Sequence, residues 1–104
     1  MTSSTMQIED SRVSNIRIDA KKISVELLDG RTLIVPILWF PRLMSGTKDE
    51  RNNWQIIGDG EGIHWPDLDE DISVEGLLAG KGSMESQKSL ARWMDARKSK
   101  RQTA

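Results

Sequence analysis

The chain has 104 residues, of which 37% are hydrophobic and 30% are charged, and this balance predicts one soluble globular domain. The absence of cysteine excludes a disulfide framework, a thiolate nucleophile and a zinc site with sulfur ligands, so a reducing cytoplasm fits best. The polar amino terminus has no signal-peptide pattern. The longest apolar run, residues 33–40, is far shorter than the ~20 residues of a membrane-spanning helix, so no membrane span is expected.

The net charge of −1 conceals an uneven distribution along the chain. Residues 1–79 carry eight basic and fourteen acidic side chains, a net charge of −6, whereas residues 80–104 carry seven basic and two acidic ones, a net charge of +5. The sequence therefore predicts an acidic body with a basic tail. The tail either stays solvated and docks on its own body, or it contacts a polyanion or an acidic partner.

The first half of the chain predicts a three-stranded antiparallel meander over residues 13–35, preceded by a flexible N-terminus of residues 1–10. The apolar residues recur largely at period two, as half-buried strands require: Val13, Ile16, Ile18, Ile23, Val25 and Leu27. Asp29-Gly30 tolerates the positive backbone angles of a tight hairpin turn, so residues 23–28 and 31–35 are expected to pair. Pro36 ends the third strand because it cannot donate to the ladder.

Two short helices are predicted next. Pro41 suits the first turn of a helix near residues 41–45, where a missing amide hydrogen costs nothing. Thr47 and Glu50 have the spacing of a capping box, which predicts a helix from Thr47 to about Asn53.

A second hairpin and two further helices complete the expected fold. Residues 54–57 and 63–65 read as strands joined by the glycine-rich turn GDGEG. Ser73 is a helix cap, and that helix ends at Gly80. The predicted class is α+β, with a domain of residues 11–80 that holds a small antiparallel sheet (meander plus hairpin) and short helices. Residues 81–104 add a basic, amphipathic helical tail.

Four stretches of this sequence carry a resemblance to a known family: LLDGRTLIVP, WFPRL, TKDERNNW and GDGEGIHWPDLDEDISVEGLL. Over residues 11–80 the chain resembles the bacterial domain-of-unknown-function 2442 (DUF2442) family. The resemblance implies a small α+β domain, found in bacteria and on mobile elements, whose gene often neighbours that of a second small protein, as in toxin–antitoxin pairs. No catalytic residues are established for the family, so none is carried over. Some relatives append a helix-turn-helix domain, but the roughly twenty-five residues after Gly80 are too few for it.

The acidic run offers weak candidates for a metal site. Asp67, Asp69 and Asp71 alternate as in the first half of a calcium loop. Such a loop needs glycine where Ile72 stands and a bidentate glutamate where Leu78 stands, so a solvated loop that caps a helix is favoured. Loose Mg²⁺ binding by two of these carboxylates remains open.

His64 is the only histidine, and histidine is the usual proton carrier near neutral pH. A metal-assisted hydrolase that combines His64 with Asp67, Asp69 and Glu70 is therefore one hypothesis. No serine elbow, cysteine or second histidine accompanies it. A structural or surface role for His64 is favoured.

The four tryptophans fall into two groups. Trp39, Trp54 and Trp65 belong to the body and are expected in the core or at its edge. Trp93 lies in the basic tail at helical spacing from Leu90 and Arg97. A helix of this kind packs on its own domain, on a protein partner, on nucleic acid or on an anionic membrane surface.

The leading functional hypothesis is a non-catalytic binding or regulatory module without a cofactor. The partner is expected to be a protein, for instance an antitoxin-like pairing with an adjacent gene product. The residues expected at the interface are Leu90, Arg92, Trp93, Met94, Arg97, Trp39, His64 and Trp65. The first alternative is nucleic-acid binding, with tail cations on phosphates and Trp93 stacked on a base. The second is the hydrolase described above.

Overall fold

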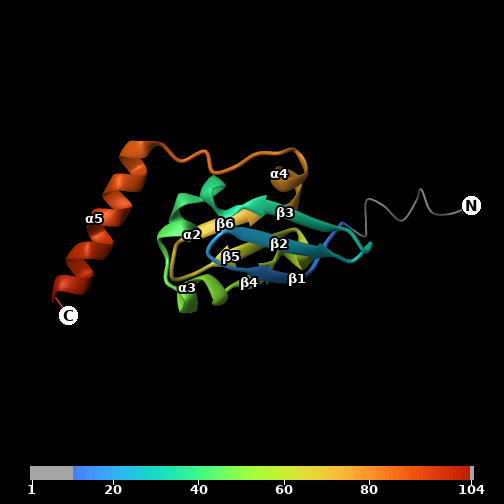
Figure 1. Ribbon diagram of the computed structural model, residues 1–104, viewed down its shortest axis with the longest axis horizontal. Helices are drawn as coiled ribbons and strands as arrows, with labels where there is room; N and C mark the ends of the chain where they lie inside the picture. Colours follow the sequence, from blue (N-terminus) through green and yellow to red (C-terminus); the bar gives the residue numbers. More distant parts are fainter. Residues whose placement is uncertain (1–10, 104) are drawn as a thin grey trace, which may run out of the picture.

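The computed structural model describes residues 11–103, so the predicted flexible N-terminus lies outside the described residues. Six strands form two antiparallel three-stranded sheets, with short helices around them and a long helix at the C-terminal end (Figure 1). This arrangement confirms the predicted α+β class. None of the helices in the described range is long and apolar enough to cross a membrane.

The first sheet is the predicted meander, in the order β1-β2-β3. Its strands are β1 (Val13–Ile18), β2 (Lys22–Leu27) and β3 (Thr32–Pro36). Val25 pairs with Leu33 and Glu26 with Thr32, which leaves three residues, 28–30, in the loop after Leu27. Only Gly30 in this loop has a positive φ, of 95°. The predicted two-residue turn was therefore wrong by one residue, and the observed loop has the length of a three-residue hairpin with glycine at the left-handed position.

The second sheet contains the predicted hairpin and one strand more, in the order β4-β5-β6. Its elements are β4 (Gln55–Ile57), the 3₁₀ turn η2 (Gly58–Gly60), β5 (Gly62–Trp65) and β6 (Glu70–Ser73). The sequence predicts an acidic loop over residues 67–71, but Glu70 pairs with Trp65 and Asp71 with His64. Strand β6 was missed because its acidic residues have low strand propensity, and its pairing with β5 outweighs that preference.

The short helices begin where the capping chemistry predicted. After the 3₁₀ turn η1 (Ile37–Trp39), they are α2 (Pro41–Ser45), α3 (Lys48–Asn52) and α4 (Val74–Leu78). The hydroxyl of Thr47 accepts from the Glu50 amide at 3.1 Å, and the Glu50 carboxylate accepts from the Thr47 amide at 2.9 Å. Ser73 caps α4 by accepting from the Gly76 amide at 2.9 Å.

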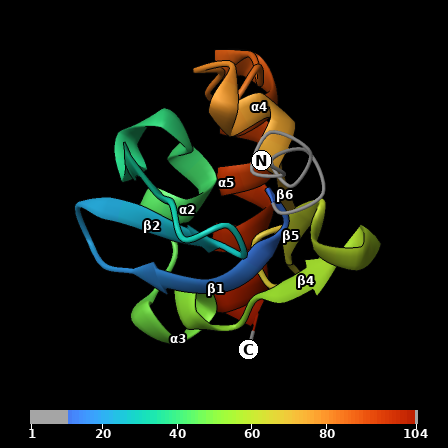
Figure 2. The ribbon, with the colours of Figure 1, turned by 90° about the vertical axis from the view of Figure 1, so that its right-hand side faces the viewer.

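The core lies between the two sheets, which face each other across it (Figure 2). Its fully buried side chains come from β2, α2, β5 and the loop after β5: Ile23, Val25, Leu43, Ile63, Trp65 and Leu68. The indole of Trp65 donates to the Arg51 carbonyl at 2.8 Å. Trp39 and Trp54 are half-buried at the edge of this core, in agreement with the predicted core or core-edge positions.

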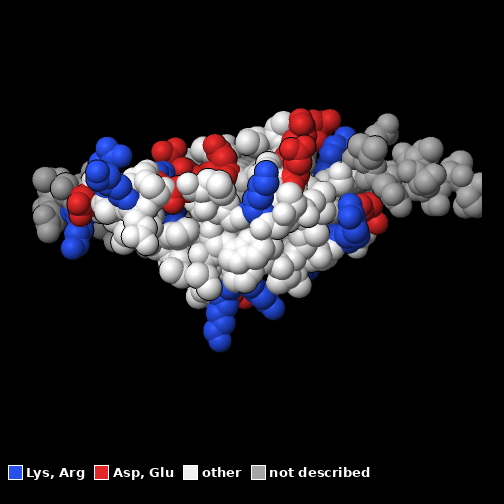
Figure 3. Space-filling model, turned by 90° about the horizontal axis from the view of Figure 1, so that it is seen from above, with Lys and Arg blue, Asp and Glu red and all other residues white. Residues whose placement is uncertain are grey.

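The long helix α5 (Gln87–Thr103) lies across the end of the body that carries α2 and α3 (Figure 1). A strap of residues 79–86 connects it to α4 and runs over Trp39, whose carbonyl accepts from the Ser83 amide at 2.9 Å. Seen from above, uncharged surface fills the lower middle of the molecule, acidic side chains lie along its upper part, and basic side chains stand at the α5 end and project below the middle (Figure 3). Of the positions that the sequence allows for the tail helix, the structure shows the one against its own body.

Candidate functional site

Helix α5 contacts the body through one narrow face. Leu90, Trp93 and Arg97 are half-buried on that face, three and four residues apart, as successive turns of one helix side require. The ring of Trp93 lies between two guanidinium groups, with Arg42 at 5.0 Å and Arg97 at 4.7 Å from the ring centroid. Both distances are within the range of a cation–π contact. Arg42 comes from α2, so Trp93 is the point where the tail meets the body.

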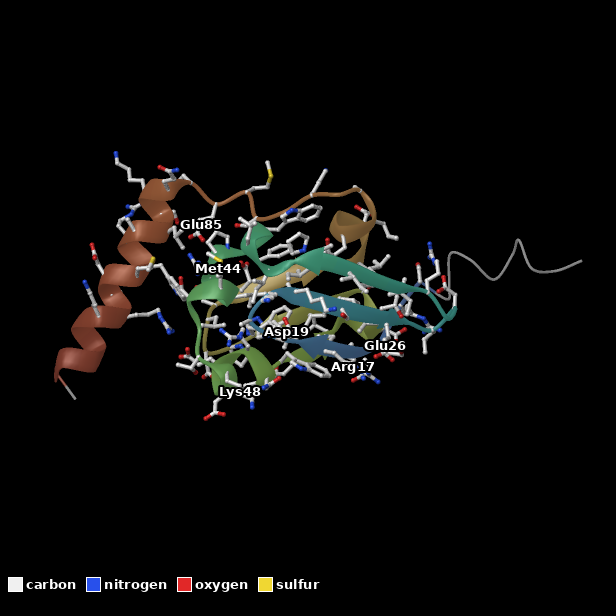
Figure 4. The ribbon with its side chains drawn as sticks, viewed as in Figure 1. Arg17, Asp19, Glu26, Met44, Lys48 and Glu85 are labelled. Carbon is white, nitrogen blue, oxygen red and sulfur yellow. The ribbon has the colours of Figure 1, made fainter. Side chains whose placement is uncertain are left out.

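Each of these two arginines is also held by a glutamate. Arg42 donates through Nε to Glu85 at 2.8 Å and through Nη2 to its second oxygen. Arg97 donates to the two oxygens of Glu50 at 2.8 and 3.2 Å. We refer to these five residues, Arg42, Glu50, Glu85, Trp93 and Arg97, as the latch. It runs from the strap through α2 and α5 to α3, and Figure 4 shows Glu85 near the end of α5 where the strap enters it.

The four charged side chains of the latch are mostly removed from solvent. The side chains of Arg42 and Glu85 are 14% and 13% exposed, and those of Arg97 and Glu50 are 17% and 21% exposed. The hydrogen bonds from Arg97 lower the pKa of Glu50 to about 2, with the Thr47 amide acting in the same direction. The bonds from Arg42 lower the pKa of Glu85, and Glu85 raises that of Arg42. A two-pronged guanidinium–carboxylate pair fixes orientation as well as charge, so α5 is held in one register.

The capping box and the latch share one carboxylate. Glu50 stands at the third position of α3 because Thr47 caps that helix, and the same carboxylate then receives Arg97 from a helix 47 residues further along the chain. The sequence predicted the local bond but not the distant one. Arg42, Glu50 and Glu85 were missed as site residues, since nothing in their local spacing signals a pair 43 or 47 residues apart.

The rest of α5 is exposed. Arg92, Met94 and Lys98 lie there, with Arg92 and Met94 on different sides of the helix because they are two residues apart, and Met94 is 44% exposed. Within the described part of the chain, neither Arg92 nor Lys98 forms an ion pair. A hollow of about 410 Å³ lies between the side of α5 that carries Met94 and Lys98 and Ser45 at the end of α2, and Ala91, Asp95 and Arg97 complete its lining.

The predicted interface residues therefore separate into several places. Leu90, Trp93 and Arg97 face the body, whereas Arg92 and Met94 are exposed on other sides of the helix. Trp39 lies under the strap. Trp65 is fully buried, so its assignment to a partner surface was wrong and the core interpretation holds.

His64 and the three aspartates do not converge. Nδ1 of His64 lies 2.5 Å from Asp71 across strands β5 and β6, on the exposed side of the second sheet. Asp67 accepts from Asn53 at 2.9 Å, and Asp69 lies 3.4 Å from Arg42. Among the residues that the structure describes, no three histidine or carboxylate side chains are grouped to hold a metal ion. The geometry therefore supplies no metal centre to the hydrolase hypothesis.

Comparison with known proteins places the whole body of this chain in one family. The sequence model described as "Protein of unknown function (DUF2442)" matches residues 13–83. A crystal structure of a protein of unknown function from Rhodospirillum rubrum is similar with a TM-score of 0.63 and 31% identity, over 73% of this chain and 94% of that one. A solution NMR structure of an uncharacterised protein from Chromobacterium violaceum has a TM-score of 0.62 and 25% identity, over 88% of this chain and 84% of that one. No curated protein matches.

Proposed function

Because the chain belongs to the DUF2442 family of proteins of unknown function, we propose its role from the site itself: a small protein-binding module that recognises its partner through α5. The observation that carries this proposal is the construction of the latch. Helix α5 is fastened by one ion pair and one tryptophan, a second ion pair holds the strap beside it, and the rest of the helix surface remains exposed.

The latch is suited to exchange. A cation–π contact is weak singly, and desolvation offsets much of the attraction in a shielded ion pair, so a partner can replace these contacts with equivalent ones of its own. A helix with exposed cations and a methionine beside an apolar hollow fits the pattern of helix-in-groove recognition. We expect the partner to present an apolar pocket and an acidic surface to Met94 and Lys98, and a further acidic group to Arg92 on another side of the helix.

The gene neighbourhood that the family resemblance implies makes the adjacent gene product the first partner to test. Co-expression with a tag on this chain is expected to co-purify that product. The double variant Arg92→Glu, Met94→Ala is expected to lose it, whereas Lys48→Glu, on the exposed end of α3, is the matched control and is expected to retain it (Figure 4). Truncation after Gly80 is expected to abolish capture. Absence of association at micromolar concentration would contradict the proposal.

Binding to nucleic acid is the second candidate, supported by the exposed cations of α5 such as Lys88 and Arg92. This function requires affinity for an oligonucleotide that falls steeply as salt rises and vanishes after truncation at Gly80. The acidic body argues against a broad footprint, because it repels phosphates on either side of the helix.

A further inference from the structure

A groove of about 580 Å³ lies between the outer edge of β6 and the strap, away from the exposed side of α5. Residues 69–73 form one wall and residues 81–85 form the other. Strand β6 is the last strand of its sheet, so no further strand fills this edge. The volume is in the range of sites that take a small molecule or a long side chain. We call this space the Glu70 groove.

Glu70 is half-buried in this groove and uses little of its hydrogen-bonding capacity. Its Oε1 accepts from the Asp71 amide at 3.1 Å. Its Oε2 is shielded from solvent and has no hydrogen-bond partner among the described residues. Burial raises the pKa of Glu70, and the Asp71 amide and Arg42 oppose this change only in part. A carboxylate can accept about four hydrogen bonds, and an unsatisfied one is costly in a half-buried place.

The other lining groups show which kind of partner the carboxylate lacks. Four carboxylates line the groove, from Asp69, Glu70, Asp71 and Glu85, against two cations, Arg42 and Lys81. Arg42 is occupied by Glu85 and by the Asp69 carbonyl at 2.9 Å. The lining therefore has an excess of two negative charges. Apolar surface for a hydrocarbon stem comes from Phe40, Ile72, Leu77 and Met84.

We propose that the Glu70 groove binds a primary alkylammonium or an alkylguanidinium ion. The ammonium or guanidinium head lies on Glu70, and the hydrocarbon stem lies along Phe40 and Leu77. The head supplies the N–H donors that the carboxylate lacks, and its charge matches the excess in the lining. The cation comes either from a free alkylamine or alkylguanidine, or from a lysine or arginine side chain of a protein. This inference does not depend on the proposed function of α5.

The groove and the latch share residues, which links the two sites. Glu85 belongs to both, and Ser89 of α5 lines the groove and donates to Glu85 at 2.8 Å. The groove is therefore complete only while α5 is docked. A cation bound there stabilises the docked helix. By thermodynamic reciprocity, a loosened latch weakens the binding of the cation.

The test is a titration of the full-length, ¹⁵N-labelled protein followed by NMR. The probes are agmatine, the blocked peptide acetyl-Gly-Arg-Gly-amide and the neutral comparator N-butylacetamide. Agmatine in the millimolar range is expected to shift the amides of Glu70, Ser73 and Ser83, while the neutral amide leaves them in place. Glu70→Gln is expected to weaken the affinity for agmatine about tenfold or more. Glu75 is an exposed glutamate outside the groove, so Glu75→Gln is expected to leave this affinity unchanged.

Each outcome decides the proposal. If agmatine binds and the peptide does not, the proposal is supported and the ligand is a free small cation. If the peptide binds as well, the ligand is a lysine or arginine side chain of a protein. The proposal is overturned if neither cation shifts these amides, if the neutral amide binds equally well, or if Glu70→Gln binds as the wild type does. Should Glu70→Gln fail to fold, the comparison of agmatine with N-butylacetamide on the wild type still decides. Loss of adjacent-protein capture with retained agmatine binding would overturn only the proposed function.

Discussion

The body and helix α5 are held together by different physical forces. The body closes around apolar side chains from both sheets, among them Ile23, Ile63 and Trp65 at 0% exposure. Helix α5 meets it through Trp93 and the Arg97–Glu50 pair, and the Arg42–Glu85 pair fastens the strap beside it. Burying a large apolar side chain contributes about 1.5–3 kcal/mol, whereas a cation–π contact contributes about 0.5–1 kcal/mol, and the desolvation of a shielded ion pair offsets much of its attraction. The helix can therefore leave the body at a small cost, while the sheets separate only when the whole body unfolds.

The largest expected effect is in the core. Trp65→Ala is expected to lower the free energy of unfolding by about 3–5 kcal/mol, because it leaves a cavity between the sheets and an unpaired Arg51 carbonyl. Urea denaturation measures this loss. Leu38→Ala, at a side chain that is 64% exposed, is the control and is expected to change the free energy by less than about 0.5 kcal/mol. Equal losses for the two variants would contradict the described core.

A backbone substitution in the body has the next largest expected effect. Gly60 has a φ of 95°, and a Cβ there would lie 2.7 Å from Cβ of Arg12. Gly60→Ala is expected to cost about 2–3 kcal/mol, because it adds a collision to the strain of the left-handed region. Gly30 has the same φ with nothing within 4 Å, so Gly30→Ala is expected to cost only about 1 kcal/mol. Thermal denaturation of the two variants would refute this reasoning if Gly30→Ala were the less stable.

A change in the latch is expected to cost less and to act locally. Trp93→Ala removes two cation–π contacts and is expected to lower the free energy of unfolding by about 1–2 kcal/mol. The amide resonances of α5 are expected to move toward disordered positions, while those of both sheets stay in place. Met94→Ala, one residue further along at a side chain that is 44% exposed, is the matched control with little expected change. Shifts throughout the sheets of the Trp93 variant would show that α5 is part of the core.

The effect expected to be smallest near neutral pH is the pH dependence of the latch. The pKa of Glu50 falls from 4.5 to about 2 on folding, so its contribution is present in full above about pH 4.5 and is lost as the pH falls toward 2. Glu85 changes in the same direction. The exchange of α5 amides is expected to accelerate over this window before that of the sheets. Glu50→Gln keeps the capping box and is expected to reduce the pH dependence of α5 amide exchange. Glu75→Gln is the control and is expected to leave it unchanged. An unaltered pH profile in Glu50→Gln would show that this ion pair does not hold the helix.

The local features of the fold could be predicted from the sequence, since they depend on neighbouring residues. Gly30 marked the first hairpin, Thr47 and Glu50 gave a complete capping box, and Ser73 began α4. Strand β6 was hidden because acidic residues outside a sheet favour loops. It forms only because β5 offers a partner strand.

The candidate sites show the same division. Trp93 and Arg97 were recognised from helical spacing, but their partners Arg42 and Glu50 lie on helices that only the tertiary fold brings near. Glu70 appeared in the sequence as one more acidic residue of a run. Its half-buried position, and an oxygen without a hydrogen-bond partner among the described residues, arise from tertiary packing, which no local pattern predicts.

Native-state amide hydrogen exchange at increasing, sub-denaturing urea tests the central claim most directly. If α5 is held by the latch alone, amides of residues 90–98 open with a low free energy that urea barely changes, because little surface is exposed. Amides of β2 and β5 then open only with the free energy and urea dependence of global unfolding. If α5 and the two sheets instead share one opening free energy with one urea dependence, the helix is an integral part of the core, and the account of a releasable binding helix is contradicted.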